Sequence, residues 1–180
     1  MNNNQIIQQT KNWIKDIVIG LNFCPFANTP FRQNTIRYQV SAANTEAELL
    51  QDILQELNLL IQNPKIETTL LIHPTVLTDF IDYNDFLYIT DQILEQADLE
   101  GIIQIASFHP DYCFDDTEPT DRENYTNRSP YPMLHFLREA SVELATTTHP
   151  NVDDIPSNNI ETLQQLSEND FQKYFGSDRI

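Results

Sequence analysis

Two side chains of this sequence are of the types that perform proton transfer and nucleophilic attack. His109 follows an apolar strand-like run and precedes a proline, and its ordinary pKa lies near neutral pH, so it could act as a general base. The alternative is a hydrogen-bonded histidine that ties the next loop to the strand end. Cys24, in the string NFCPFA, would be the nucleophile if it met His109. The alternative, which we favour for Cys24, is a small buried apolar side chain.

The most site-like segment runs from Phe108 to Arg138, and every candidate substrate-binding residue comes from it. These candidates are Arg128, Asn127, Tyr125, Tyr112 and Arg138. An arginine fork suits a carboxylate or a phosphate, so we expect a small anionic metabolite at Arg128, aided by the free amides of a helix that begins near Pro132. The alternatives are that Arg128 pairs with a local acid and that Arg138 pairs with an acid or caps the loop.

The sequence lacks the standard motifs of several common enzyme and cofactor-binding classes. The chain has 3 glycines and 2 cysteines, with neither a glycine-rich nucleotide-binding loop nor a paired-cysteine zinc site. It also lacks a GxSxG nucleophile elbow and an HExxH helix. We therefore expect no cofactor and no metal. A weaker alternative is a metal bound by His73 and His109 together with nearby carboxylates.

Charge narrows the classes of partner. The sequence has 27 acidic and 10 basic residues and a formal net charge of −17. Nucleic acids and anionic membranes require clustered Lys and Arg, so neither is expected as a partner. No apolar run approaches the roughly 18 residues of a membrane span, and the N-terminus has no secretory-signal pattern. These features predict an acidic, cytoplasmic protein with reduced cysteines.

Helical and strand periodicities alternate along the chain. The expected helices cover about 5–21, 45–62, 78–97, 132–145 and 158–175, and the expected strands cover 35–40, 68–72 and 102–108. Thr45 and Thr78 are the expected N-terminal caps of the second and third helices, and Pro132 fits the first turn of the fourth. Residues 28–33 and 111–129 are expected to be loops, the second one unusually long.

This alternation in a chain of 180 residues predicts a single α/β domain. We expect a small, mostly parallel three-stranded sheet flanked by helices, with a long ordered loop after the last strand. Residues 1–4 and roughly 150–180 are expected to form a flexible terminus or a peripheral helix. Ligands of parallel sheets bind at the edge where the strands' carboxyl ends meet. His73 and His109 each begin a His-Pro dipeptide after a strand, so both should emerge at that edge.

Six segments carry a resemblance to a known family: WIKDIVIGLNFCPFA, TIRYQV, TTLLIHP, DFIDYNDFL, GIIQIASFHPDYCF and NYTNRSPYPMLHFLRE. From about Trp13 to Ser141 the sequence resembles the bacterial family known as domain of unknown function 1415. The string TNRSPYPMLHFLRE is the most specific of these matches. The resemblance implies a compact bacterial protein and transfers no catalytic residue. Cys113 departs from the family pattern, which makes it a poor catalytic candidate.

These observations favour a small-molecule enzyme or a metabolite-binding protein. Arg128 would hold an anionic group of the ligand, His109 would move a proton, and Cys24 would attack. The alternative is a non-catalytic protein-interaction module, in which the long loop packs on itself and presents its exposed part to a partner. A separation of Cys24 and His109 beyond hydrogen-bond reach would remove the catalytic pair, and arginines paired within the loop, with no concave pocket, would favour the alternative.

Overall fold

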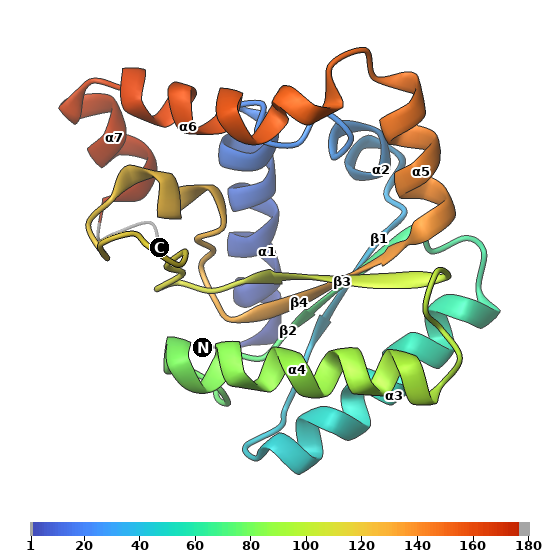
Figure 1. Ribbon diagram of the computed structural model, residues 1–180. Helices are drawn as coiled ribbons and strands as arrows, with labels where there is room; N and C mark the ends of the chain where they lie inside the picture. The colour runs from blue at the N-terminus through green and yellow to red at the C-terminus, as the bar shows by residue number, and fades with distance from the viewer. Residues whose placement is uncertain (1, 177–180) are drawn as a thin grey trace.

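Four strands form one mixed sheet with helices on both faces (Figure 1). The computed structural model describes residues 2–176. The strands are β1 (Ile36–Val40), β2 (Thr68–Ile72), β3 (Ile103–Phe108) and β4 (Met133–Arg138), in the order β1-β2-β4-β3. β1 and β2 are parallel, and β4 runs antiparallel to both β2 and β3. β1, β2 and β3 therefore point in the same direction.

The helices account for most of the remaining chain. They are α1 (Asn3–Trp13), α2 (Asn28–Gln33), α3 (Glu46–Gln62), α4 (Phe80–Gln96), α5 (Glu139–Thr148), α6 (Ile155–Gln165) and α7 (Glu168–Phe175). A π-helix, η1 (Ile14–Ile19), continues α1, and two short 3-10 helices are η2 (Arg122–Thr126) and η3 (Val152–Asp154). Among the described residues, no helix is long and apolar enough to cross a bilayer.

The three expected strands are confirmed to within one residue at each end. β2 is the clearest case, because all five of its residues are buried. Its edges pair with β1 and β4, and its two faces are covered because Leu71 lies in one core and Ile72 in the other. A strand covered on both faces has an almost continuous apolar sequence, as in the TTLLI run of β2.

The expected fourth helix at 132–145 is wrong, and with it the three-stranded, mostly parallel sheet. Residues 133–138 form β4, and α5 begins only at Glu139. β4 lies between β2 and β3. Met133, Leu134 and Phe136 are fully buried, because Met133 packs in one core and the other two pack in the core on the opposite face. A short apolar run of this kind fits a buried helix or a buried strand equally well. Hydrogen bonding to two neighbouring strands decides for the strand.

Several helix boundaries also differ from expectation. Residues 28–33 form α2 instead of a loop. Thr45 caps α3 as expected, but the cap of α4 is Asp79, whose carboxylate accepts from the backbone amides of Ile81 and Asp82, and not Thr78. The expected segment 158–175 forms two helices, α6 and α7. The expectation of flexible or peripheral termini extends to Met1 and to residues 177–180, which lie outside the described part of the chain.

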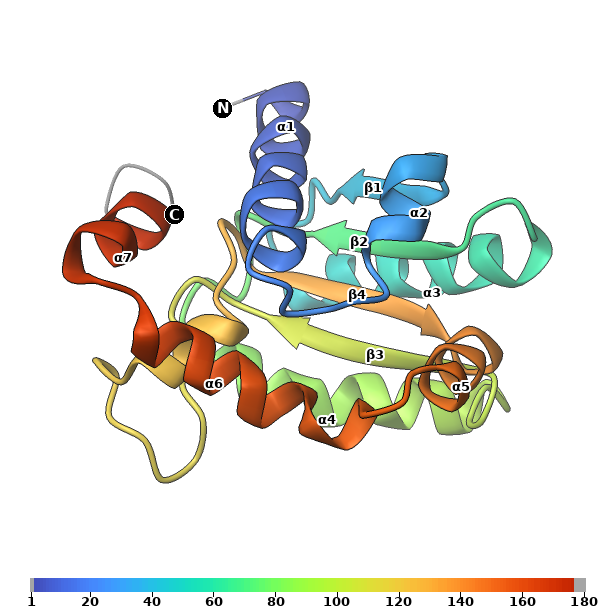
Figure 2. The same ribbon diagram turned by 90° about the horizontal axis from the view of Figure 1, so that it is seen from above.

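The sheet divides the interior into two cores (Figure 2). The α4 face is the side covered by α3 and α4, where Leu71 and Phe136 are buried. The α1 face is the opposite side, covered by α1, η1, α6 and α7, where Ile72 and Met133 are buried. Because side chains alternate along a strand, consecutive residues such as Leu71 and Ile72 belong to different cores.

Candidate ligand-binding site

His73 and His109 lie at the same edge of the sheet, as expected from the shared direction of β2 and β3. A carbonyl oxygen can only accept a hydrogen bond, so both imidazole rings act as donors. His73 Nδ1 donates to the backbone oxygen of Val76 at 2.9 Å, and His109 Nε2 donates to that of Leu77 at 3.3 Å. Leu77 has a left-handed backbone with φ of 55°, which is unfavourable for a large side chain. The two rings thus hold consecutive carbonyls of one tight turn.

Tyr83 of α4 lies between the two histidine rings. Its ring centroid is 5.8 Å from that of His73 and 5.0 Å from that of His109. The Tyr83 hydroxyl donates to the backbone oxygen of Met133 at 2.9 Å and accepts from the amide of Phe108 at 3.0 Å. The cluster therefore connects the ends of β3 and β4 to α4, with its hydrogen-bond donors directed to backbone oxygens.

Neither histidine is exposed to solvent. Both have 0% exposed surface. Burial lowers the pKa of His73 to about 4 and also lowers the pKa of His109, because a charged ring is poorly solvated there. The second nitrogen of His109, Nδ1, accepts from the amide of Asp111 at 3.0 Å. Within the described residues, no group of three or more potential ligands is arranged to hold a metal ion.

Arg128 binds the loop in which it lies. Its Nε donates to the backbone oxygen of Tyr112 at 3.1 Å, and one terminal nitrogen donates to that of Pro119 at 2.7 Å. The guanidinium lies 4.2 Å from the centroid of the Tyr125 ring. No helix begins directly after Arg128, because residues 129–132 lead into β4. The amides that would have completed the expected anion site are therefore not arranged as a helix N-terminus.

Arg138 lies at the other end of the sheet, on the last residue of β4. Its guanidinium donates to three carbonyl oxygens at and just beyond the end of α3, those of Leu60, Asn63 and Ile66, at 2.5 to 3.2 Å. The last carbonyls of a helix have no partner within the helix, and Arg138 supplies donors to this group. This contact caps α3.

Aromatic contacts and a buried asparagine hold the long loop between β3 and β4 in place. Tyr125 packs edge-on against Phe171 and Phe175 of α7, with centroids 4.8 and 5.0 Å away. Tyr112 packs against Phe114 at 4.9 Å. The completely buried Asn124 accepts from the Phe114 amide at 2.9 Å, and its side-chain nitrogen donates to the backbone oxygen of Glu118 at 2.8 Å. The loop is thus ordered by its own side chains.

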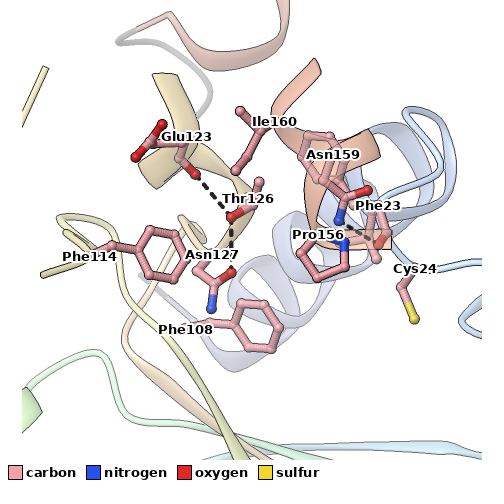
Figure 3. Close-up of a pocket in the computed structure, with 11 residues that line it drawn as sticks. Phe23, Cys24, Phe108, Phe114, Glu123, Thr126, Asn127, Pro156, Asn159 and Ile160 are labelled. Atoms are coloured by element: carbon pink, nitrogen blue, oxygen red, sulfur yellow. Dashed lines mark hydrogen bonds between the residues drawn. The ribbon is translucent and has the colours of Figure 1, made fainter. Parts of the chain in front are cut away.

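A cavity of about 440 Å³ lies on the α1 face, beside the end of β3 (Figure 3). Its walls come from η1 and the loop after it, from β3 and the long loop with η2, and from α6. The lining residues are Val18, Phe23, Cys24, Phe108, Phe114, Glu123, Thr126, Asn127, Pro156, Asn159 and Ile160. Three phenylalanines and several aliphatic side chains make this lining largely apolar, which is typical of sites for small molecules.

The amides of the cavity wall are held in place by backbone groups. Asn127 Nδ2 donates to the carbonyl of Ser107 at 3.4 Å, and Asn159 Nδ2 donates to that of Phe23 at 2.9 Å. The Thr126 hydroxyl lies 3.1 Å from Asn127 Oδ1. These contacts fix the positions of polar side chains around an apolar space before any ligand is present.

Cys24 and Asn127 are the two sequence candidates that line the cavity. Burial raises the pKa of the Cys24 thiol, although hydrogen bonding to the backbone of Phe26 and Ala27 acts in the opposite direction. A raised pKa leaves the thiol protonated at neutral pH, whereas a nucleophilic cysteine needs thiolate character. The geometry therefore favours Cys24 as part of the wall.

The structure does not bring Cys24 and His109 together. Phe108 points to the α1 face, where its ring contacts Trp13 with centroids 5.3 Å apart, and it lines the cavity with Cys24. His109 is the next residue, and its ring contacts Phe80 and Tyr83 of α4. Alternation along the extended chain thus places the two candidate catalytic side chains on opposite faces of the sheet.

The π-helix η1 gives the cavity one of its walls. The carbonyl of Val18 accepts from the amide of Cys24 at 3.3 Å. Gly20 ends this helix, and a Cβ atom there would lie 2.2 Å from the carbonyl oxygen of Asp16. A glycine is therefore required at this turn. π-Helices are rare and occur frequently at functional sites.

Comparison with known proteins supports the family assignment. Residues 5–173 match the family described as Protein of unknown function (DUF1415). The chain belongs to this family. No curated protein matches the sequence, and no solved structure matches the fold. The family match includes all of the residues that line the cavity, from Val18 to Ile160.

Most of the cavity wall was not found from the sequence. Phe108 was recognised as the end of a strand and the start of the site-like segment, but not as part of an apolar wall. α6, which contributes Pro156, Asn159 and Ile160, was expected as part of a peripheral helix. No local pattern indicates that α6 packs beside η2, because that contact joins segments far apart in the chain. The buried Asn124 was missed because its contacts with Phe114 and Glu118 depend on how the loop folds back on itself.

Proposed function

We propose that this protein binds a small molecule with a largely apolar, ring-sized body in the cavity between η1, β3, η2 and α6. The observation that carries the proposal is the cavity itself, about 440 Å³ and lined by Phe23, Phe108 and Phe114. A volume of this size is within the range of small-molecule sites. Burial of an aromatic ring against such a lining would supply the free energy of binding.

Binding without turnover agrees best with the positions of the candidate catalytic groups. His109 uses both ring nitrogens in contacts with the backbone, and the Cys24 thiol has a raised pKa. The arginines expected to hold an anion, Arg128 and Arg138, are bonded to backbone carbonyls. An apolar or neutral ligand needs none of these groups.

A neutral aromatic probe tests this function directly. Indole added to the purified full chain should give ligand-observed NMR saturation transfer and should raise the melting temperature, since a ligand that binds only the folded state stabilises it. Ile160→Trp should weaken indole binding at least tenfold, because the larger side chain projects from α6 into the cavity. Val18→Phe should do the same from η1.

Leu144→Trp is the matched control, because Leu144 lies on α5 with 66% of its surface exposed and does not line the cavity. This variant should bind indole like the parent chain. Circular dichroism would establish that the three variants are folded. Indole binding that persists unchanged in both Ile160→Trp and Val18→Phe would contradict the proposed site.

A further inference from the structure

We propose that the free edge of β1 binds an extended, acidic segment of a partner protein as an additional strand. This surface is separate from the cavity, whose lining includes no residue of β1, so it can be tested independently of the proposed function. Three features support it: outward backbone groups at this edge, the contrast with the opposite edge of the sheet, and the charges beside β1.

β1 is the outermost strand on one side of the sheet. In a parallel pair of strands, alternate residues bond to the neighbouring strand. The amide of Ser41 donates to the carbonyl of Ile72 in β2 at 2.8 Å, so residues 37 and 39 face β2 as well. The backbone groups of Ile36, Tyr38 and Val40 are therefore directed away from the sheet.

The open part of this edge is formed by Ile36 and Tyr38. Both residues are partly exposed, and within the described residues no hydrogen bond to their outward backbone groups is found. The edge closes at Val40, which has 7% exposed surface and whose carbonyl accepts from Gln39 Nε2 at 3.2 Å. A strand added by a partner would supply the missing hydrogen bonds, as in other exposed sheet edges.

The opposite edge of the sheet is partly covered by the chain itself. At one end of β3 the amide of Ile103 donates to the carbonyl of Leu99 at 3.0 Å. At the other end the carbonyl of Ser107 accepts from Asn127 Nδ2 at 3.4 Å, and the amide of His109 donates to the carbonyl of Asn127 at 3.3 Å. Only the middle of β3 is left open, so β1 offers the better edge for an added strand.

β1 lacks the features that usually prevent an edge strand from pairing, such as a proline, a bulge or a free charge. Its sequence is IRYQV, and it pairs in regular register with β2 over its whole length. The guanidinium of Arg37 is bonded to both carboxylate oxygens of Glu56, at 2.6 and 2.8 Å. This pair neutralises the charged side chain of the strand.

Basic side chains lie beside β1 on the α1 face. Lys11 Nζ lies 5.0 Å from the centroid of the Tyr38 ring, because α1 packs against β1 (Figure 2). Lys15 lies about one turn further along, in η1, and Arg32 is in the last turn of α2. Within the described part of the chain, none of these three cations forms an ion pair. The ammonium of Lys11 is thus available to a carboxylate placed next to Tyr38.

The distribution of charge along the chain agrees with this local contact. Residues 1–45, which form α1, η1, α2 and β1, contain four basic residues and one acidic residue, a formal charge of +3. The remainder has six basic and 26 acidic residues, a formal charge of −20. An acidic segment is therefore attracted to the β1 side of the protein and repelled by the rest of its surface.

The two faces of an added strand would meet different charges. Its side chains on the α1 face would lie about 5 Å from Tyr38, close to Lys11. On the α4 face they would lie beside the pair of Arg37 and Glu56, near Asp52, which accepts from the Ser41 hydroxyl. Acidic residues at alternate positions, with uncharged residues between them, fit this arrangement.

Three blocked eight-residue peptides test the proposal: one in which glutamate alternates with valine, and analogues in which glutamine or lysine replaces each glutamate. Their affinities for the full chain would be measured by fluorescence anisotropy. At low ionic strength the glutamate peptide should bind about tenfold more tightly than the glutamine peptide, and the lysine peptide should bind most weakly. The advantage of the glutamate peptide should decrease at high salt, because exposed charges are screened.

Hydrogen exchange identifies the edge that is used. Binding of the glutamate peptide should slow exchange of the amides of Ile36 and Tyr38, which become bonded to the added strand. The amides of Arg37 and Gln39, which face β2, should exchange slowly with and without the peptide. Peptide binding that leaves exchange at Tyr38 unchanged would overturn the proposal, as would a failure of all three peptides to bind.

A double variant tests the role of the neighbouring cations. Lys11→Gln with Lys15→Gln should remove most of the advantage of the glutamate peptide over the glutamine peptide. The matched control is Lys173→Gln, which removes a charge from an exposed position on α7 and should leave that advantage unchanged. Circular dichroism would establish that both proteins are folded. An equal reduction by the two proteins would contradict recognition at β1.

The alternative occupant of this edge is a second copy of the chain. Sedimentation would then show a dimer without any peptide, and the amides of Ile36 and Tyr38 would already exchange slowly in it. That result would refute the acidic partner. Indole binding to the cavity is measured separately, so the failure of either proposal leaves the other intact.

Discussion

The two faces of the sheet at the end of β3 differ in packing, although aromatic side chains are present on both. On the α4 face, His73, Tyr83 and His109 form a buried cluster whose donors are bonded to backbone carbonyls. On the α1 face, Phe108 and its neighbours surround an open cavity of about 440 Å³. The histidines, whose side chains are suited to catalysis, thus lie in the packed region, while the space for a ligand lies on the opposite face of the sheet.

Residue type is therefore a weak guide to a site when the local backbone also needs hydrogen-bond partners. Histidine and arginine supply donors, and the turn after β2, the long loop and the end of α3 all contain carbonyls that require them. In this chain those structural requirements account for His73, His109, Arg128 and Arg138. The cavity is formed mainly by side chains without such chemistry.

A matched pair of truncations would test the comparison most strongly. Ile53→Ala, in the α4-face core at 0% exposure, should lower the free energy of unfolding by about 3–4 kcal/mol, because a new cavity is left in a packed region. Ile160→Ala should cost about 1 kcal/mol, since this side chain already borders open space. Urea denaturation measures both. Equal losses would show that the two faces are packed alike.

Removal of one hydroxyl tests the polar contacts of the packed region. Tyr83→Phe leaves the amide of Phe108 and the carbonyl of Met133 without their buried partner, and should lower the free energy of unfolding by about 2 kcal/mol. Tyr88→Phe, on the same helix with 68% exposure, should change it by less than about 0.5 kcal/mol. Similar effects for the two tyrosines would indicate that the Tyr83 hydroxyl is dispensable.

The pH dependence of stability probes the same region. The pKa of His73 is lowered to about 4 by burial, from an unfolded value of about 6.5. As the pH falls, His73 therefore binds a proton in the unfolded chain before it does so in the folded chain. The contribution of neutral His73 to the free energy of unfolding is intact above pH 6.5 and is lost progressively towards pH 4. Between pH 7 and pH 5 the loss from His73 should be about 2 kcal/mol.

The measurement is a series of urea denaturations between pH 5 and pH 7.5, compared with His73→Gln. Between pH 7 and pH 5 the free energy of unfolding of the variant should fall by about 2 kcal/mol less than that of the parent chain. This difference does not depend on the stability of the variant at neutral pH. Parallel curves for the two proteins would mean that His73 gains a proton as easily in the folded as in the unfolded state.

The smallest expected effect concerns the thiol of the cavity wall. In a Cys113→Ser background, alkylation of Cys24 by iodoacetamide should reach half its maximal rate at a higher pH than in the urea-unfolded chain, because burial raises the pKa of Cys24. A mass-spectrometric time course gives the rates. Faster alkylation in the folded chain at neutral pH would restore Cys24 as a candidate nucleophile.

Local sequence determined much of the fold. The β2 run from Thr68 to Ile72 and the cap of α3 at Thr45 are properties of short segments, and they were predicted from periodicity and capping chemistry. The common direction of β1, β2 and β3 also followed, because helices connect them in order. The family resemblance was likewise carried by short strings, and it is confirmed by the match over residues 5–173.

Only the tertiary structure decided the remainder. MLHFLR became a strand because β2 and β3 offered hydrogen bonds on both sides, and this changed the sheet from three strands to four. Phe108 and His109 were assigned to opposite faces by the pleat of β3, and α6 closed a cavity beside β3. Each of these outcomes depends on contacts between distant segments, which no local window of the sequence contains.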